Sequence, residues 1–389
     1  MLSFDNTEIA FSGKSDADLK RSFWLFKLIR NPVFVNIGSK LCDVAIGLHL
    51  PIKGFIKATI FKQFVGGETI TECDHTVEAL GKFHIGTILD FSVEGKETEK
   101  DFDHCAGEIQ ATLEKAKGNK NIPFCVFKTT GLARFSLLEK ISGGTELSFS
   151  EKAEFSLVQK RIHKICEKAA ENRVPLFMDA EESWIQLAMD NIANEMMSLF
   201  NKEIPIVYNT FQLYRKDRLA YLKKSFEKAQ KGNYVLGAKL VRGAYMEKER
   251  LRAMNLNYQC PIQNSKQETD GDYDAALEYC IDHIDRIAVC AGTHNENSSR
   301  YLVDLMKRKN ISPSHPHVHF SQLLGMSDHL SYNLANAGYN VSKYVPYGPV
   351  KEVLPYLIRR AQENTSVKGQ TGRELSLLIK EQSRRKGHL

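Results

Sequence analysis

The sequence predicts an α/β protein whose main part folds as an eight-stranded (β/α)8 barrel of the TIM type, with an N-terminal helical arm. Eight short apolar runs, rich in β-branched residues, recur from about residue 84 onward. Their spacing of roughly 27 to 50 residues leaves room for a crossover helix after each run, as parallel strands require. Polar residues follow the runs, and barrel enzymes collect their chemistry at the carboxyl ends of the strands.

We expect strands at the eight apolar runs, in the order residues 85–91, 123–127, 174–178, 204–208, 236–241, 287–290, 317–320 and 341–345. A helical-looking stretch follows each run. An open doubly wound sheet is the second possibility. The chain carries no GxGxxG motif after an early run, which argues against that alternative.

Composition and charge place the chain among ordinary globular proteins. It has 389 residues, 42% of them hydrophobic and 26% charged, and a formal net charge of +6. This mild charge gives no reason to expect a nucleic-acid partner. The eight cysteines form no CxxC pair, so we expect reduced thiols and no metal site.

The N-terminus carries Asp5 and Glu8 and lacks the layout of a signal or transit peptide. No apolar run is long enough for a membrane span. We therefore expect a cytoplasmic protein, with peripheral contact to the inner membrane as a further expectation.

We predict three parts: a helical arm over residues 1–80, a catalytic barrel over 81–370 and a basic C-terminal tail over 371–389. Residues 20–62 of the arm contain eight basic residues and only one acidic residue, Asp43. The basic residues alternate with apolar ones. One interpretation is an arm packed on the barrel with its lysines in water. The other is attachment to an anionic membrane surface.

The run Tyr356-Leu-Ile-Arg-Arg-Ala-Gln-Glu363 follows the eighth predicted strand. In a helix, Tyr356 lies four residues before Arg360, and both Arg359 and Arg360 lie within reach of Glu363. Adjacent arginines backed by one acid suit bidentate binding of a small carboxylate. The competing interpretation is a salt bridge on a solvated helix face.

The strand ends and this helix together resemble the proline dehydrogenase family, both the monofunctional enzymes and the first catalytic domain of bacterial bifunctional proline-utilisation enzymes. The similarity runs from about Lys128 to Asn364, and the stretch from Tyr344 to Arg360 is especially similar to the mitochondrial type. Its other dense parts are Lys239-Leu-Val-Arg-Gly-Ala-Tyr245, Thr293-His-Asn295 and Phe320-Ser-Gln-Leu-Leu-Gly-Met326.

The resemblance implies a distorted (β/α)8 barrel that binds a flavin, FAD with FMN as the alternative, and oxidises L-proline to 1-pyrroline-5-carboxylate. Hydride transfer would run from the ring carbon beside the amine to flavin N5, and a membrane quinone would accept the electrons. The oligomeric state stays open.

The resemblance also assigns residues. Lys128, Arg359 and Arg360 would bind the proline carboxylate, Asp179 and Glu363 would hold these cations, and Leu323, Tyr344 and Tyr356 would shape the ring pocket. The cofactor-binding residues would be Asn209, Gln212, Lys239, Val241, Arg242, Gly243, Ala244, Tyr245, Thr293, His294, Asn295 and Gln322. Between Asn209 and Gln212, the residue that touches the flavin ring stays open.

Three rival functions remain. Hydroxyproline is an alternative substrate, although the bulk of Tyr344 should crowd an extra ring hydroxyl. A non-catalytic flavin-binding or membrane-scaffold barrel is a second, and it would not need the complete set of carboxylate-binding residues. An unrelated phosphate-binding barrel enzyme is the third, and it leaves the paired arginines unexplained.

Overall fold

The computed structural model describes residues 2–31, 53–92, 97–366 and 370–387. Eight strands form a closed parallel barrel in chain order, which confirms the predicted fold class. The strands are β1 (Ile85–Phe91), β2 (Phe124–Lys128), β3 (Leu176–Asp179), β4 (Val207–Gln212), β5 (Leu236–Val241), β6 (Ile287–Gly292), β7 (Val318–Leu323) and β8 (Val341–Tyr347).

The strand limits differ from the predicted runs in a consistent way. β1 and β5 match the predicted residues, whereas β2, β3, β4, β6, β7 and β8 each end one to four residues later than predicted. β4 also begins late, at Val207. Pro205 has no N–H to donate, and the amides of Ile206 and Val207 donate to Asn201 Oδ1 at 3.0 and 2.7 Å.

The chain divides into two compact units, and each is described by itself. The central unit is Glu94–Ser321, and the terminal unit combines Met1–Val93 with Gln322–Leu389. The domain limits predicted from the sequence remain a prediction.

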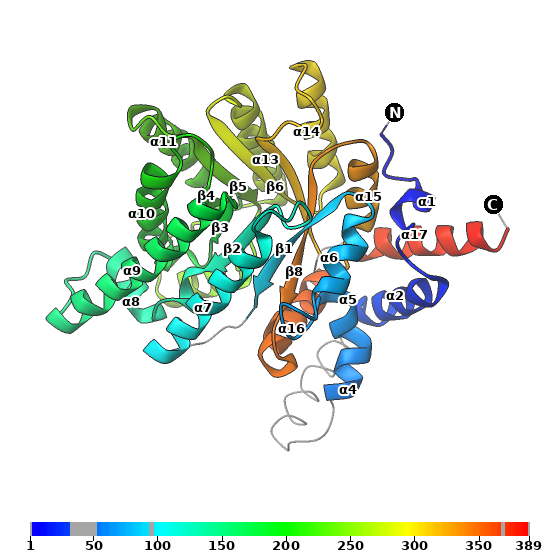
Figure 1. The fold of residues 1–389 in the computed structure, drawn as a ribbon, viewed down its shortest axis with the longest axis horizontal. Helices are drawn as coiled ribbons and strands as arrows, with labels where there is room; N and C mark the ends of the chain where they lie inside the picture. The colour runs from blue at the N-terminus through cyan, green and yellow to red at the C-terminus, as the bar shows by residue number, and fades with distance from the viewer. Residues whose placement is uncertain (1, 32–52, 93–96, 367–369, 388–389) are drawn as a thin grey trace. The chain divides into compact units, whose positions relative to one another are not determined.

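In the central unit, helices flank the parallel strands β2 to β6 on the outside (Figure 1). They are α7 (Glu99–Ala116), α8 (Phe135–Ser142), α9 (Phe149–Asn172), α10 (Ser183–Phe200), α11 (Arg218–Lys231), α12 (Met246–Asn255), α13 (Lys266–Asp282) and α14 (Glu296–Arg308), with a 3₁₀ turn, η2, at Thr129–Gly131. The strands are buried on both faces, which explains why they read as continuous apolar runs. Ser148 and Glu151 form a capping box that fixes the start of α9.

In the terminal unit, β1 pairs in parallel with β8, from Ile85 opposite Val341 to Phe91 opposite Tyr347. Its helices are α1 (Thr7–Ala10), α2 (Asp16–Ile29), α4 (Lys53–Ile56), the π-helix η1 (Lys57–Phe61), α5 (Lys62–Phe64), α6 (Asp74–Gly81), α15 (Asp328–Asn336), α16 (Val350–Ser366) and α17 (Gln370–Arg385). α2 packs beside α17 (Figure 1).

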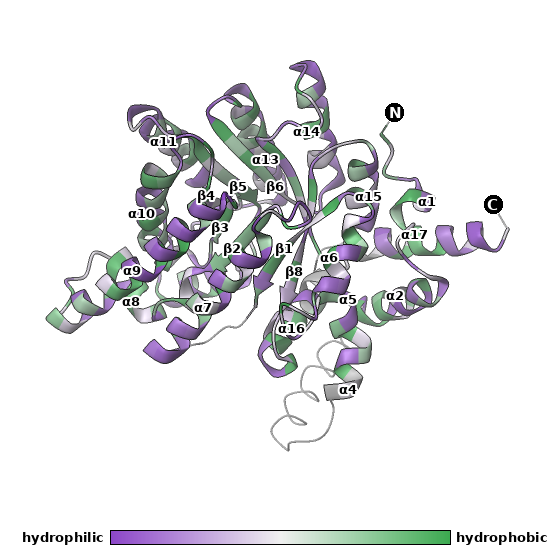
Figure 2. Cartoon of the chain, viewed as in Figure 1, coloured by the Kyte–Doolittle hydropathy of each residue, from purple (hydrophilic) through white to green (hydrophobic). Residues whose placement is uncertain are grey.

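An apolar cluster joins the helices of the terminal unit. It includes Phe26 of α2, Phe61 of η1, Leu357 of α16 and Leu378 of α17, all at most 5% exposed. Hydrophilic and hydrophobic residues both occur along α17, as its amphipathic sequence requires (Figure 2). The helical arm of the prediction is therefore packed on an apolar core over the residues that the structure describes.

Several sequence expectations concern residues outside this description. Lys40, Cys42 and Asp43 of the basic arm lie outside the described residues. Where the structure describes the chain, no helix is long and apolar enough to cross a membrane.

Candidate active site

The carboxyl ends of β2, β3 and β5 bring three charged side chains of the central unit together. Lys128 ends β2 and is the register partner of Asp179, which ends β3. Asp179 Oδ1 accepts a hydrogen bond from Lys239 Nζ of β5 at 2.5 Å, and Lys239 is 5% exposed. Its ammonium also lies 5.4 Å from the centre of the Phe177 ring. Asp179 thus binds Lys239, a residue assigned to the cofactor, and pairs in register with Lys128, a residue assigned to the substrate.

Glu181 follows β3 and supports the turn that begins after Lys128. Its carboxylate accepts from the backbone N–H of Thr130 at 3.1 Å and from Thr130 Oγ1 at 2.6 Å. Burial raises the pKa of Glu181 to about 7, and the two Thr130 hydrogen bonds and the Lys128 charge offset only part of this effect. Glu181 is therefore a proton-binding group next to a predicted substrate residue.

Asn209 and Gln212 both lie within β4, of which Gln212 is the last residue, and their surroundings differ. Asn209 Nδ2 donates to Asp190 Oδ1 at 2.9 Å, and its Oδ1 accepts from Thr210 N, so both ends of this amide are used within the fold. Gln212 is 2% exposed, and its Oε1 has no hydrogen-bond donor among the described residues. A buried acceptor of this kind suits a bound group that carries an N–H or O–H.

The turn after β5 is built around Arg242. Its guanidinium donates to Asp270 at 2.7 Å, to Thr293 Oγ1 at 2.8 Å and to Ser298 Oγ at 2.9 Å. It also lies over the Tyr273 ring, 4.4 Å from its centre. These partners fix the plane of the guanidinium.

The residues around Arg242 leave backbone exposed. Gly243 has φ +136, and a Cβ there would lie 2.4 Å from the Tyr214 ring. Gly243 and Ala244 are exposed, Val241 and Tyr245 are half-buried, and Lys248 lies 5.4 Å from the centre of the Tyr245 ring. Only glycine fits at position 243, which leaves open backbone next to a fixed cation.

The Thr293-His294-Asn295 turn after β6 forms hydrogen bonds that stabilise the fold. Thr293 Oγ1 accepts from Asn295 N at 3.1 Å as well as from Arg242. Asn295 is the N-cap of α14 and accepts from Ser298 N at 3.1 Å. His294 is half-buried between them. The fold explains these contacts of Thr293 and Asn295, and a cofactor role for the three residues stays a prediction.

The central unit fits the flavin that the resemblance implies. A fixed guanidinium, a buried ammonium, exposed glycine backbone and a buried amide oxygen without a donor among the described residues suit a planar cofactor with an anionic tail.

The terminal unit holds the other predicted site residues. Gln322 of β7 is buried, and its Oε1 accepts from Ser331 Oγ at 2.8 Å. Leu323 ends β7 and packs against the apolar cluster. Tyr344 of β8 is 6% exposed, and its carbonyl accepts from Leu324 N at 2.8 Å. This bond ties the residue after Leu323 to Tyr344.

The predicted helix after β8 is α16, and it brings Tyr356 and Arg360 together as the spacing requires. Tyr356 is 5% and Arg360 9% exposed, and the Arg360 guanidinium lies 5.2 Å from the centre of the Tyr356 ring. Arg359 is half-buried. Glu363 belongs to α16, but its side chain lies outside the described part of the chain. An arginine this buried is unlike a residue on a solvated helix face.

Sequence patterns did not predict Asp270 and Ser298 as partners of Arg242. They sit on α13 and α14, 28 and 56 residues away along the chain, outside any strand-end pattern. The buried pair of Asp190 and Arg218, at 2.7 Å, is similar in this respect. Only the fold identifies such residues.

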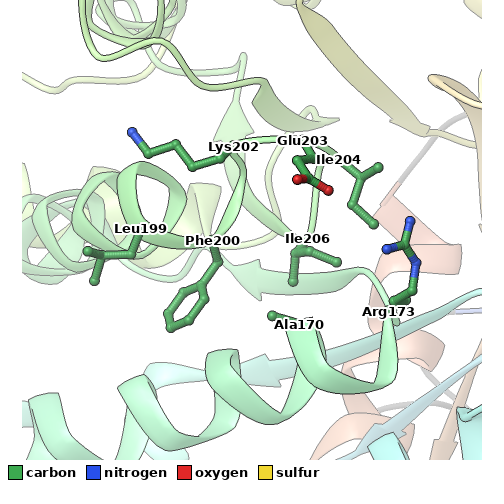
Figure 3. A pocket seen from close by; sticks show the side chains of 8 residues that line it. All are labelled: Ala170, Arg173, Leu199, Phe200, Lys202, Glu203, Ile204 and Ile206. Atoms are coloured by element: carbon green, nitrogen blue, oxygen red, sulfur yellow. The ribbon is translucent and has the colours of Figure 1, made fainter.

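One surface cavity, of about 250 Å³, lies at the amino ends of β3 and β4 and is lined by Arg173, Phe200, Lys202 and Ile206, among others (Figure 3). The predicted site residues follow the carboxyl ends of the strands, so we assign this cavity no part in the reaction. Among the described residues, no group of three or more His, Cys, Asp or Glu side chains could hold a metal ion.

The amino-acid sequence is similar to those of known proteins. The family model described as proline dehydrogenase matches residues 73–373. A curated relative, "Proline dehydrogenase 1, mitochondrial" from Dictyostelium discoideum, is 35% identical over 99% of this chain and 75% of its own length. "Hydroxyproline dehydrogenase" from Xenopus laevis is 32% identical over 99% of this chain and 90% of its own length.

Among solved structures, proline utilization A from Bdellovibrio bacteriovorus, inactivated by N-propargylglycine, superposes with a TM-score of 0.77 at 20% sequence identity. The match covers 94% of this chain and 41% of that longer one. At this identity the likeness shows the fold alone, and it agrees with the closed barrel found here.

Proposed function

The chain belongs to the proline dehydrogenase family, and on this premise we propose that it oxidises L-proline to 1-pyrroline-5-carboxylate. The family match over residues 73–373 is the observation that carries the proposal. The buried Arg360 on α16 supports it, because a desolvated guanidinium suits a carboxylate ligand better than a solvated one does. These points disfavour a non-catalytic scaffold and an unrelated phosphate-binding barrel.

For the substrate, we assign Arg359 and Arg360 to the carboxylate, with Lys128 as a further cation. Leu323, Tyr344 and Tyr356 supply an uncharged wall for the ring. Asp179 and Glu363 act as counter-ions in this assignment. Together these residues would hold the ring carbon in one orientation, and orientation is a large part of the catalysis that a protein can add to a cofactor.

For the cofactor, we propose FAD. The bound flavin would supply the hydride acceptor for the ring carbon beside the amine. Arg242 and Lys239 would neutralise the anionic parts of the cofactor, and Gly243 would let the backbone approach it. Gln212 is the better candidate than Asn209 for a hydrogen bond to the ring, because the Asn209 amide is already used by Asp190 and Thr210.

Hydroxyproline is the second candidate substrate, and the similarity to the Xenopus laevis hydroxyproline dehydrogenase favours it. Steady-state turnover with both imino acids tests the choice. We expect a higher kcat/KM for L-proline, and a preference for hydroxyproline would overturn this part of the proposal. Tyr344→Ser should shift the ratio toward hydroxyproline, because it removes bulk from the ring wall.

For the electron acceptor, we propose a membrane quinone, reached by peripheral contact from the cytoplasmic side. Trp24 and Leu28 of α2 are 58% and 51% exposed and lie four residues apart. Lys20 and Lys27 are exposed on the same helix, and the Lys27 ammonium lies 4.8 Å from the centre of the Trp24 ring. A tryptophan flanked by lysines suits an anionic bilayer surface.

Co-sedimentation with vesicles tests this surface. The protein should bind anionic vesicles at low salt, and Trp24→Ser together with Leu28→Ser should weaken binding about tenfold. Phe149→Ser is the matched control, because Phe149 is 90% exposed on α9. Equal binding by all three proteins would remove α2 from the proposal.

Several relatives are named mitochondrial proteins, so the cytoplasmic location also needs a direct test by fractionation of the source cells.

A further inference from the structure

Leu323, the last residue of β7, and the four residues after it form the 323–327 loop, which is fixed by contacts from several elements of the terminal unit. Leu324 N donates to Tyr344 O of β8 at 2.8 Å, and Gln63 Nε2 of α5 donates to Gly325 O at 2.8 Å. Gly325 has φ +76, and a Cβ there would lie 2.1 Å from the Gln63 carbonyl oxygen. The 323–327 loop is therefore pressed backbone to backbone against Gln63.

Lys343 reaches the same loop from β8. Its side chain is 1% exposed, and Nζ donates to Met326 O at 2.5 Å and to Leu323 O at 3.4 Å. Lys343 precedes Tyr344, and successive strand residues point to opposite faces. The strand thus carries a proposed ring-wall residue on one face and an anchor for the 323–327 loop on the other.

The Lys343 charge is compensated locally. Asp328 Oδ1 lies 2.9 Å from Lys343 Nζ, and Asp328 Oδ2 lies 3.2 Å from Lys14 Nζ. Burial by itself would raise the pKa of Asp328, but the Lys343 and Lys14 charges outweigh it and hold this pKa well below its usual range. On the other side, Ser327 N donates to Glu374 Oε1 of α17 at 2.5 Å. Residues distant in sequence therefore converge on one loop.

We propose that Lys343 is a positioning residue for proline oxidation: by binding the carbonyls of Leu323 and Met326, it holds the 323–327 loop so that Leu323 and Tyr344 keep the shape of the ring wall. The proposal rests on the proposed function for its substrate. It adds a residue that touches neither the substrate nor the cofactor.

Hydrogen–deuterium exchange tests the anchor without any substrate. Lys343→Met removes the donor to the loop, whereas the control Lys14→Met removes the other cation from Asp328 and leaves the loop carbonyls bound. We expect the amides of Leu324 and Ser327 to exchange at least tenfold faster in K343M and within twofold of wild type in K14M. Equal exchange in the two variants would overturn the proposal.

Kinetics test the consequence for the substrate. K343M should raise KM for L-proline at least tenfold, leave kcat within threefold, retain the flavin and reduce the preference for proline over 4-hydroxyproline. A lowered melting temperature with unchanged KM in both variants would mean a merely structural role. If K343M does not fold, Asp328→Asn preserves the side-chain shape and must raise KM where K14M does not. Wild-type protein without proline turnover would refute the proposed function alone, because the exchange experiment needs no substrate.

Discussion

The two units hold their predicted site residues by different means. In the central unit, Lys239 and Arg242 each have an acidic partner: Asp179 lies 2.5 Å from Lys239 and Asp270 lies 2.7 Å from Arg242. In the terminal unit, Leu323 and Tyr356 lie in or against the apolar cluster, and Lys343, which is paired with Asp328, donates to the Leu323 carbonyl. Explicit charge pairs suit a cofactor with anionic groups, whereas apolar packing suits a small apolar ring that carries one carboxylate.

The largest expected effect comes from removing a cation of the terminal unit. Arg360→Met should cost about 2 to 5 kcal/mol in proline binding, because a desolvated carboxylate would lose its partner. Steady-state kcat/KM measures the loss. Arg384→Met is the control in the same unit, since Arg384 is a partly exposed arginine paired with Glu381 on α17. Equal effects of the two substitutions would place Arg360 outside the substrate site.

A pH experiment addresses the central unit. The folded-state pKa of Glu181, about 7, is raised above the ordinary value of 4.5, so its contribution to stability is complete below pH 4.5 and is lost as pH rises toward 7. The Glu181 contribution to wild-type stability should therefore fall as pH rises across this window, by about 1 kcal/mol for each pH unit. Glu181→Gln should remove that slope in urea unfolding. An unchanged slope would mean that Glu181 does not titrate near neutrality.

Arg242→Lys tests whether the central unit depends on its fixed guanidinium. Lysine cannot reach Asp270, Thr293 and Ser298 together, so we expect a loss of about 1.5 to 3 kcal/mol in flavin affinity. Flavin retained after dialysis, read from its absorbance, gives the result. Arg286→Lys, at a half-buried arginine that donates to Asn233 Oδ1, should retain the flavin fully. Full retention by R242K would leave Arg242 with a structural role only.

The smallest expected effect separates a helix cap from a cofactor contact. Asn295→Ala removes the N-cap of α14 and should lower the free energy of unfolding by about 1 kcal/mol. The flavin content should stay unchanged if Asn295 only caps the helix. A lost flavin with unchanged stability would instead support the contact that the resemblance implies.

Local patterns predicted much of the fold and part of the site. The apolar run at residues 236–241 forms β5, as predicted. The spacing of Tyr356 and Arg360 predicted that they share a helix face, and the Arg360 guanidinium does lie over the Tyr356 ring. The hydrogen bond from Asn209 to Asp190 was not predictable, because Asp190 lies on α10 and no local sequence pattern links the two residues. The proposed role of Lys343 in holding the 323–327 loop was not predictable either. In the sequence Lys343 is an ordinary strand residue, and its contacts depend on how β8 packs against α15.

We propose above all that this protein binds a flavin and that L-proline reduces the bound flavin. Anaerobic titration of the flavin-loaded protein with L-proline is the decisive experiment, with R360M as the comparison. The yellow absorbance of the wild-type protein should disappear as proline is added, and R360M should keep its colour until proline is at least about thirtyfold more concentrated, as a loss of about 2 kcal/mol requires. Wild-type protein that holds its flavin and stays yellow at saturating proline would refute the proposed proline oxidation.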